Sequence, residues 1–380
     1  MKICFLADAF LKDPSTGING AQVQMYFIAK GLAEKGWQIH YVAGTWQVNK
    51  FGKAEYIDGI YVHWYKLRRY PPLLNTPNIL RLLKEINPDI VYNRGRSYLT
   101  GVSAWFTKFN NKKFVWASNG EDGCDKGKHI KRLFNKRRIF FKKLLLLPES
   151  FLNDRIYEWG IKRANLIVNQ TWKQKKALNQ NFKKEGVIIK SGHTVPQRLK
   201  PKTYPPIILW LANFSPVKQP EIFVNLAQKC KDLDCRFIMA GGTLDTGYLN
   251  RVLNSAKNLL NFEYRGELSL EESNALLEEV SILVNTSKRE GEGISNTMVQ
   301  AWLREVPVVT LLVDPDDVLK KNHIGFHSQS FEQLVKDVRY LIQHSDERKE
   351  MGKRAREFAI KEYNIDKIIS DYEKTLKDIL

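Results

Sequence analysis

The stretch REGEGISNTMVQAW, at residues 289–302, decides the fold because it joins an apolar strand, ILVN, to a helix through a glycine-rich turn. Gly293 permits close approach of the backbone, and Ser295 or Asn296 can cap the helix that follows. The amides exposed at a helix start suit an anion, and the carboxylate of Glu292 beside them suits the hydroxyl groups of a sugar. A capped helix with solvent-facing polar residues is the alternative.

The pattern of a short apolar strand followed by a helix repeats outward from this stretch in both directions. Such runs alternate with helical segments, which is typical of parallel sheets covered on both faces. Residues 194–206 contain four prolines and no periodicity, and they separate two such halves. We therefore predict two doubly wound α/β domains that face each other across a cleft, with ligands at the carboxyl ends of the strands. The runs that predict strands are 2–7, 38–43, 90–92, 114–117, 166–168, 187–189, 207–211, 236–240, 282–285 and 308–311.

Positive charge is concentrated in the first half of the chain. The 380 residues include 60 Lys and Arg against 41 Asp and Glu, a net charge of +19, and residues 1–200 hold 36 of the basic but only 14 of the acidic residues. The densest segment is 126–143, where Phe134 and other apolar residues are interleaved and four leucines follow. We predict that residues 126–147 bind an anionic membrane surface. A solvated helix face and nucleic-acid binding are the alternatives, and no nucleic-acid-binding motif supports the second.

Several classes of protein are excluded by composition. Four scattered cysteines are too few for a disulfide scaffold, and Cys230 and Cys235 are predicted to be buried free thiols. The first ten residues do not resemble a secretory signal, and no run approaches 18 apolar residues. The histidines lack metal-ligand spacing, and turn chemistry explains the acidic run at 314–317. We expect a cytoplasmic protein, soluble or attached to the inner face of the cell membrane, that needs no metal.

Three further residues follow predicted strands and could act on a ligand. Lys218 stands where the first helix of the second half should begin, so it is either a cation for a diphosphate or a solvent-exposed lysine. Gly20 would let a loop of the first half approach a ligand closely. Glu121 could take a proton from a hydroxyl group, or simply pair with nearby lysines. The dinucleotide fingerprint and the Walker A pattern are both missing.

In this order and spacing, the motifs resemble those of the retaining glycosyltransferases of family 4, which have the GT-B architecture. The family's Gly-Ala-Glu corresponds to residues 20–22, and its Gly-Arg-Leu followed by Lys corresponds to residues 212–214 and Lys218. Its two glutamates, separated by seven residues, correspond to Glu292 and Gln300. The resemblance extends over nearly the whole chain.

The resemblance implies a domain of residues 1–195 on the acceptor side and a donor-binding domain of residues 196–363, with a C-terminal helix at about 364–380 that returns to the first. It implies that Lys218 binds the donor diphosphate, that Glu292 holds the transferred sugar, and that Gly20 approaches the donor phosphate. It also places further residues at the donor: Asn213, Gly293, Ile294, Ser295, Asn296, Thr297 and Gln300.

The expected reaction is transfer of a sugar, with retention, from a nucleoside-diphosphate sugar to a glycan or lipid-linked acceptor in surface polysaccharide assembly. No cofactor is expected. Asn213 replaces the family's arginine, Gln300 replaces its second glutamate, and its histidine in the first half is missing near Ser118. A catalytically silent homologue that acts as a binding partner in glycan assembly is therefore the alternative.

Overall fold

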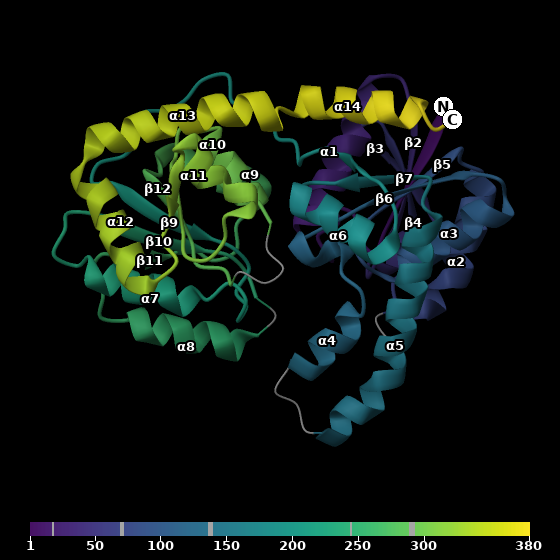
Figure 1. The fold of residues 1–380 in the computed structure, drawn as a ribbon, viewed down its shortest axis with the longest axis horizontal. Helices are drawn as coiled ribbons and strands as arrows, with labels where there is room; N and C mark the ends of the chain where they lie inside the picture. Colours follow the sequence, from purple (N-terminus) through teal and green to yellow (C-terminus); the bar gives the residue numbers. More distant parts are fainter. Residues whose placement is uncertain (17–18, 69–71, 136–139, 244, 289–292) are drawn as a thin grey trace. The chain divides into compact units, whose positions relative to one another are not determined.

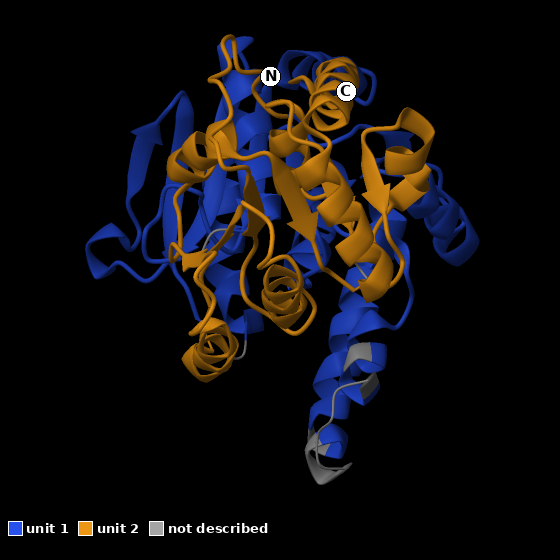
Figure 2. Ribbon diagram, turned by 90° about the vertical axis from the view of Figure 1, so that its left-hand side faces the viewer, with its two compact units in different colours: residues 1–192, 365–380 blue, residues 193–364 orange. Residues whose placement is uncertain are grey.

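The chain forms two compact units, and the computed structural model describes residues 1–16, 19–68, 72–135, 140–243, 245–288 and 293–380 of it. Unit 1 consists of residues 1–192 and 365–380, and unit 2 of residues 193–364 (Figure 2). Each unit builds its own, mostly or wholly parallel, sheet and its own hydrophobic core. The α/β class with two Rossmann-like folds is thus confirmed.

Within the described residues, unit 1 has an eight-stranded sheet in the order β3-β4-β2-β1-β5-β6-β7-β8. All neighbours are parallel except β3 and β4, which pair antiparallel. The strands are β1 (Lys2–Ala7), β2 (Gln38–Thr45), β3 (Ala54–Ile57), β4 (Ile60–Lys66), β5 (Ile90–Arg94), β6 (Lys113–Ala117), β7 (Leu166–Asn169) and β8 (Val187–Ile188).

Helices cover both faces of this sheet, which explains why its central strands are continuously apolar. Along β1, Ile3 and Phe5 face one core, while Cys4 and Leu6 face another. The helices are α1 (Gly20–Glu34), α2 (Thr76–Ile86), α3 (Tyr98–Phe109), α4 (Lys128–Asn135), α5 (Phe140–Arg163), α6 (Trp172–Phe182) and α14 (Ile365–Lys377), with short 3₁₀ turns η1 (Val48–Lys50), η2 (Pro72–Asn75) and η3 (Glu121–Cys124).

Helix α14 completes the core of unit 1 from the far end of the chain. Ile369 packs where Gly31 of α1 has no side chain, and a Cβ at that glycine would collide with the isoleucine. The hydroxyl groups of Tyr372 and Tyr92 lie 3.2 Å apart inside the core. A salt bridge of 3.0 Å joins Glu373 to a lysine just after α1. The last helix of the chain is therefore part of unit 1.

The β3–β4 hairpin is absent from the strands predicted above, although the sequence contains a signal for it. Asp58 and Gly59 form a two-residue turn with φ of +51° and +82°, the left-handed conformation that Asp-Gly pairs favour in hairpins. A Cβ on Gly59 would approach the Cβ of Ala33 in α1 to 3.0 Å. The hairpin extends the sheet beyond β2 and packs its turn against α1.

The basic segment at 126–147 falls on α4 and the first part of α5, which pack as a helical hairpin (Figure 1). Asp154 of α5 accepts hydrogen bonds from the backbone N–H groups of His129 and Ile130, at 2.9 and 3.1 Å, and so caps α4. Residues 136–139 lie outside the described residues. No helix in the described ranges is both long and apolar enough to cross a membrane.

Unit 2 has, among its described residues, a parallel six-stranded sheet in the order β11-β10-β9-β12-β13-β14. The strands are β9 (Ile207–Leu211), β10 (Arg236–Ala240), β11 (Phe262–Tyr264), β12 (Ile282–Asn285), β13 (Val308–Thr310) and β14 (Gly325–His327). The helices are α7 (Pro220–Lys229), α8 (Thr246–Ala256), α9 (Leu270–Glu279), α10 (Asn296–Trp302), α11 (Val318–Asn322), α12 (Phe331–Gln343) and α13 (Ser345–Tyr363), with the 3₁₀ turn η4 (Pro315–Asp317). The predicted linker at 194–206 lies within unit 2, where Arg356 donates to the Pro196 carbonyl at 2.7 Å.

Two stacked histidines in unit 1 make its stability depend on pH. Nδ1 of His40 and Nε2 of His63 lie 2.9 Å apart, which is hydrogen-bond distance. One of these two nitrogens must therefore carry a proton and donate it, while the other accepts. Burial, the charge of His63 and that of Lys2 lower the pKa of His40 to about 4, and burial lowers the pKa of His63. Because the unfolded chain takes up these protons first as the pH falls, unfolding becomes more favourable below about pH 6.5.

We expect His40 to cost about 2 kcal/mol of folding free energy at pH 5 relative to pH 7.5. Chemical denaturation at the two pH values measures this cost. The difference should shrink by that amount in His40→Phe, whose side chain does not titrate. His344→Gln, which alters an exposed histidine of unit 2, should behave like the wild type. An equal pH dependence in all three proteins would contradict the prediction.

Candidate functional site

The candidate site in unit 2 lies at the carboxyl ends of three neighbouring strands. Strands β10, β9 and β12 are adjacent in the sheet, so the loops that follow them meet at one edge. In the described part of the chain, these loops comprise residues 212–219, 241–243, 245, 286–288 and 293–295. The described parts of these loops contain Asn213, Lys218 and residues 293–295, whereas Asn296, Thr297 and Gln300 lie in α10 and Gly20 lies in unit 1. Ligands in open parallel sheets bind at this edge.

Lys218 lies in a tight turn between β9 and α7. Its backbone N–H donates to the Ser215 carbonyl at 2.9 Å, and the next residue, Gln219, has a left-handed φ of +48°. Helix α7 then begins at Pro220, so the prediction that Lys218 opens the helix is wrong by two residues. The reason is local, since proline is favoured in the first turn of a helix and the residue before proline is restricted. Lys218 is half-buried, and Asn213 in the same loop is exposed.

The turn that carries Lys218 is fastened to the loop after β12. The hydroxyl group of Thr286, which is fully buried, donates to the Lys218 carbonyl at 2.6 Å and accepts a hydrogen bond from the Trp210 indole at 2.9 Å. The backbone N–H of Lys288 donates to the Val217 carbonyl at 2.9 Å. These bonds hold the lysine backbone beside the segment that leads to Glu292. Sequence reasoning missed Thr286, because nothing local marks a residue that acts across 68 positions.

Glu292 itself lies outside the described residues, together with Arg289, Glu290 and Gly291. Its assignment to the transferred sugar therefore stays a prediction.

The loop after β10 approaches the loop after β9 too closely for a side chain. Gly241 has a φ of +144°, and a Cβ on it would fall onto the Ala212 carbonyl. The Gly241 N–H donates to the Gly266 carbonyl at 2.7 Å, and the Tyr264 hydroxyl group donates to the Gly241 carbonyl at 2.9 Å. Glycine is thus required here, and the backbone has no room to shift.

The start of α10 has the cap that the sequence indicated. Ser295 is the N-cap, and its side chain accepts the Met298 N–H at 3.2 Å. The side-chain oxygen of Asn296 lies 3.2 Å from Nε2 of His193, whose pKa is lowered to about 4 by burial. Sequence reasoning did not identify His193, which follows a stretch without helix or strand. Gln300 is 6% exposed, so little of its amide reaches solvent.

The remaining donor-side residues are placed as follows. Gly293 and Ile294 precede the cap, and Thr297 lies in the first turn of α10. The backbone N–H of Thr297 belongs to the first turn of the helix, where N–H groups have no partner within the helix itself. Asn213, Lys218 and residues 293–297 therefore share one edge of the unit 2 sheet, as predicted from the sequence.

In unit 1, Glu121 follows β6 and begins η3. Its carboxylate is almost fully buried, accepts a hydrogen bond from the Thr171 hydroxyl at 3.0 Å, and lies 3.8 Å from the Lys173 ammonium group. Pairing with a nearby lysine, the alternative raised from sequence, is therefore present. Gly20 is the first residue of α1, next to the N-cap Asn19. The roles predicted for Glu121 and Gly20 stay predictions.

A half-buried acid directly after β1 was missed. Asp8 accepts hydrogen bonds from Tyr98 at 3.1 Å and Tyr65 at 3.5 Å. Burial raises the pKa of its carboxyl group despite these two bonds. An acidic residue directly after a predicted strand was the signal that could have found it. The perturbed carboxyl makes Asp8 a second candidate for proton transfer in unit 1.

Neither the acidic turn nor the cysteines form a metal site in the described residues. Asp314 caps α11 by accepting the Leu319 N–H at 2.9 Å, as turn chemistry predicted. Cys230 and Cys235 are buried free thiols, also as predicted. No group of three or more His, Cys, Asp or Glu side chains in the described ranges could hold an ion.

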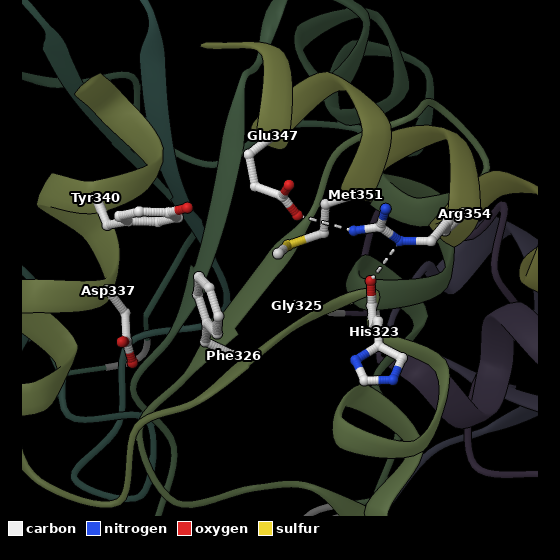
Figure 3. A pocket seen from close by; sticks show the side chains of 8 residues that line it. All are labelled: His323, Gly325, Phe326, Asp337, Tyr340, Glu347, Met351 and Arg354. Atoms are coloured by element: carbon white, nitrogen blue, oxygen red, sulfur yellow. Dashed lines mark hydrogen bonds and ion pairs between the residues drawn. The ribbon is translucent and has the colours of Figure 1, made fainter. Parts of the chain in front are cut away.

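A separate cavity of about 630 Å³ lies beside β14 at one edge of the unit 2 sheet (Figure 3). Phe326, Tyr340 and Met351 supply its apolar wall. Arg354 donates to the His323 carbonyl and pairs with Glu347, both at 3.0 Å. Because these charged groups already satisfy one another, we place the candidate donor site at the carboxyl ends of the strands instead.

Two family models match the chain, one in each half. The family model described as "Glycosyl transferases group 1" matches residues 193–358, and the model described as "Glycosyltransferase Family 4" matches residues 18–189. The structure resembles that of HepE from Anabaena in complex with UDP and glucose, with a TM-score of 0.71, 15% identity and full coverage of both chains. It also resembles sucrose-phosphate synthase from Thermosynechococcus elongatus, with a TM-score of 0.74, 13% identity and coverage of 99% and 98%.

One curated relative matches a shorter stretch. A protein named GDP-mannose 4,6-dehydratase, from Yersinia enterocolitica, is 36% identical over 93 residues, which are 23% of this chain and 24% of that protein. The chain therefore spans about a quarter of the length of this relative. The structural likenesses, at their low identity, show that the fold is of the GT-B type.

Proposed function

We propose that this chain, which belongs to the group 1 glycosyltransferases, transfers a sugar with retention from a nucleoside-diphosphate sugar to a glycan or lipid-linked acceptor. The observation that carries the proposal is the position of Lys218. Its turn is hydrogen-bonded to the segment after β12, at the carboxyl edge where parallel sheets bind ligands. A lysine in this place supplies a compact cation for a diphosphate.

In the proposed reaction, Lys218 stabilises the charge that develops on the departing diphosphate. Backbone N–H groups of residues 293–297 add hydrogen bonds to the same oxygens. Donors that are held in place before the reaction are effective because they need no rearrangement as the charge forms. The hydrogen bonds from Thr286 to the Lys218 carbonyl and from Trp210 to Thr286 hold the Lys218 backbone in place before the reaction.

The other roles in the proposal follow the predicted correspondence. Glu292 holds hydroxyl groups of the transferred sugar, Gln300 contacts the ribose, and Asn213 adds a neutral hydrogen bond where relatives have a cation. The acceptor hydroxyl attacks from the face that the diphosphate leaves, which retains the anomeric configuration. In unit 1, Gly20 serves the donor phosphate, and Glu121 accepts the hydroxyl proton. No metal or cofactor is required, because protein cations and amides neutralise the diphosphate.

The function is tested by a thermal-shift screen with UDP, GDP, ADP and CMP, followed by their sugar conjugates. UDP is the first choice, since the Anabaena structure named above was obtained with it. Binding of one nucleotide should raise the melting temperature by linkage, and the effect should vanish in Lys218→Ala. Nuclear magnetic resonance of the product then identifies its anomeric configuration. A stabilising donor without transfer or hydrolysis would favour the silent homologue, as Asn213 and Gln300 allow.

We further propose that the α4–α5 hairpin attaches a cytoplasmic enzyme to an anionic membrane that presents a lipid-linked acceptor for surface polysaccharide. Phe134 and Leu144 on this hairpin are more than half exposed, at 51% and 57%, next to basic residues such as Lys131. Exposed apolar side chains among lysines suit the boundary between headgroups and acyl chains. The cap from Asp154 holds α4 against α5 without using these side chains.

Replacing Lys126, Lys131 and Lys143 with glutamine should weaken binding to phosphatidylserine-containing vesicles about 100-fold, since each lysine near such a surface contributes about 1 kcal/mol. Co-sedimentation with anionic and with neutral vesicles measures the effect. A control with Lys84, Lys108 and Lys176 replaced by glutamine has the same net charge and alters exposed lysines of unit 1 outside the hairpin. Unchanged vesicle binding in the hairpin variant would show that the hairpin is only a solvated surface.

A further inference from the structure

Unit 1 has a cavity of about 510 Å³ whose lining includes none of the residues assigned to the reaction. It lies at the start of β2, between the last turns of α1 and the β3–β4 hairpin, and Lys30, Glu34 and Gln38 are among its lining residues. The carboxyl ends of the strands, with Glu121, are at the opposite edge of the same sheet. The cavity is therefore separate from the residues assigned to the reaction.

Two tyrosines give this cavity an aromatic wall. Tyr56 of β3 and Tyr61 of β4 are direct cross-strand partners, with ring centroids 4.8 Å apart and planes inclined by 53°. They are 67% and 43% exposed, so each keeps a large area of ring in contact with water. Single exposed aromatic side chains are ordinary, but two adjacent ones that line a cavity indicate a binding surface.

The position of both rings is set by the surrounding structure. The ring of Tyr61 stacks on that of His40, with centroids 5.2 Å apart and planes inclined by 22°. The hairpin turn between the tyrosines is tied to α1, because Asp58 accepts a hydrogen bond from Tyr26 at 2.6 Å and pairs with Lys12 at 2.5 Å. A ligand would therefore meet rings that are already in place, which lowers the entropic cost of binding.

The charges around the cavity favour a neutral ligand. Although the first half of the chain is strongly basic, Lys30 lies 3.8 Å from Glu34, and Asp58 is paired with Lys12. Gln38 contributes an exposed amide. An uncompensated cation for phosphate or sulfate is thus missing from these described lining residues. Amide and carboxylate groups beside aromatic rings suit a molecule with many hydroxyl groups and apolar C–H faces.

We propose that Tyr56, Tyr61, Gln38 and Glu34 form a tyrosine platform that binds a neutral saccharide chain outside the catalytic site. The C–H faces of sugar rings stack on the two tyrosines, and their hydroxyl groups bond to Gln38 and Glu34. The platform holds a part of the glycan that is remote from the reacting end. The binding of a saccharide follows from the platform alone. That this saccharide is the acceptor or the product of the reaction rests on the proposed function.

An array of neutral and anionic glycans, probed with the purified full-length chain without nucleotide, tests the platform. The wild type should bind neutral oligosaccharides, and titration calorimetry with the best of them should give a dissociation constant at least ten-fold weaker for the double variant Tyr56→Ala, Tyr61→Ala. Tyr56→Phe keeps its ring and should retain most of the affinity. Trp105→Ala removes another exposed aromatic ring of unit 1 and is the control.

Binding of a saccharide to the tyrosine platform can be measured independently of the donor site. Both tyrosines are exposed, so the double variant should stay folded, and its stabilisation by nucleotide should be unaffected. If no neutral glycan binds, or if binding survives in the double variant, the platform is refuted even when transfer activity is present. If no nucleotide sugar binds, the proposed function fails, while binding of saccharide to the tyrosines still stands on its own measurement.

Discussion

Replacing Lys218 with alanine is expected to lower kcat/KM for sugar transfer about 100- to 1,000-fold, the usual cost of removing one fixed donor to a developing negative charge. The proposed target is the leaving diphosphate, which in this site meets a neutral Asn213 where relatives have an arginine. In the proposed reaction, the cation of Lys218 therefore carries a larger share of the charge stabilisation. Its backbone is held through the Ser215 and Thr286 bonds, and alanine preserves both of them.

Transfer rates and melting temperatures of three variants test this prediction. Lys218→Ala should keep the wild-type melting temperature, because the side chain is only half-buried and the turn is held by backbone atoms. Lys218→Arg keeps the charge but not the compact ammonium group, so part of the activity should return. Lys257→Ala, at an exposed position after α8, should be fully active. Wild-type transfer by Lys218→Ala would remove the main support for the proposed donor site.

Replacing Gly241 with alanine is expected to destabilise unit 2 by about 3 kcal/mol or more, combining the cost of an unfavourable φ with a backbone collision. The new Cβ would fall onto the Ala212 carbonyl, which is a main-chain atom of the neighbouring loop. The strand cannot move away easily, because hydrogen bonds to Gly266 and from Tyr264 hold both sides of the glycine. The loop that carries Asn213 would be displaced first.

Gly247→Ala is the matched control for this experiment. Gly247 lies in α8, and its nearest atoms to a new Cβ are side-chain atoms of Asp245 and Arg251, at 3.5 and 3.8 Å. Alanine there should be neutral or stabilising by up to about 1 kcal/mol, as is usual for a glycine in a helix. Urea unfolding followed by tryptophan fluorescence compares the two variants. Equal midpoints for both would show that the loops after β9 and β10 are not packed as described.

The elements that could be predicted are those whose pattern is local. Strands at 207–211, 236–240 and 282–285 were predicted with the same bounds that the structure has, because short apolar runs between turn residues are a direct sign of buried parallel strands. Helix α1 has its left-handed glycine at Gly36, with a φ of +83°. The β3–β4 hairpin was missed although Asp58 and Gly59 marked it, and the short strands β11 and β14 have too few residues to form a pattern.

The candidate site also has parts that local sequence patterns predict and parts that they do not. Lys218 and residues 293–297 could be placed on one edge, because each follows a recognisable strand and parallel strands end together. Their hydrogen-bond partners could not be predicted, since Thr286 and Lys218 are 68 positions apart in the sequence and His193 and Asn296 are 103 apart. Such contacts depend on how strands align in the sheet, which no local window contains. The tyrosine platform is likewise produced by the register that sets Tyr56 opposite Tyr61.

The sequence by itself determined the α/β class, the division into two doubly wound folds, the family resemblance and the loops that carry the candidate chemistry. These follow from periodicity and turn chemistry, which act within a few residues. Only the tertiary structure decided which groups meet: the hydrogen bonds that hold the backbone of Lys218, the collision that requires glycine at 241, the burial of Glu121, and the hydrogen bonds from two tyrosines to Asp8. The physical reason is that hydrogen-bond geometry, burial and the resulting pKa shifts are properties of neighbours in space, and folding brings those neighbours from distant parts of the chain.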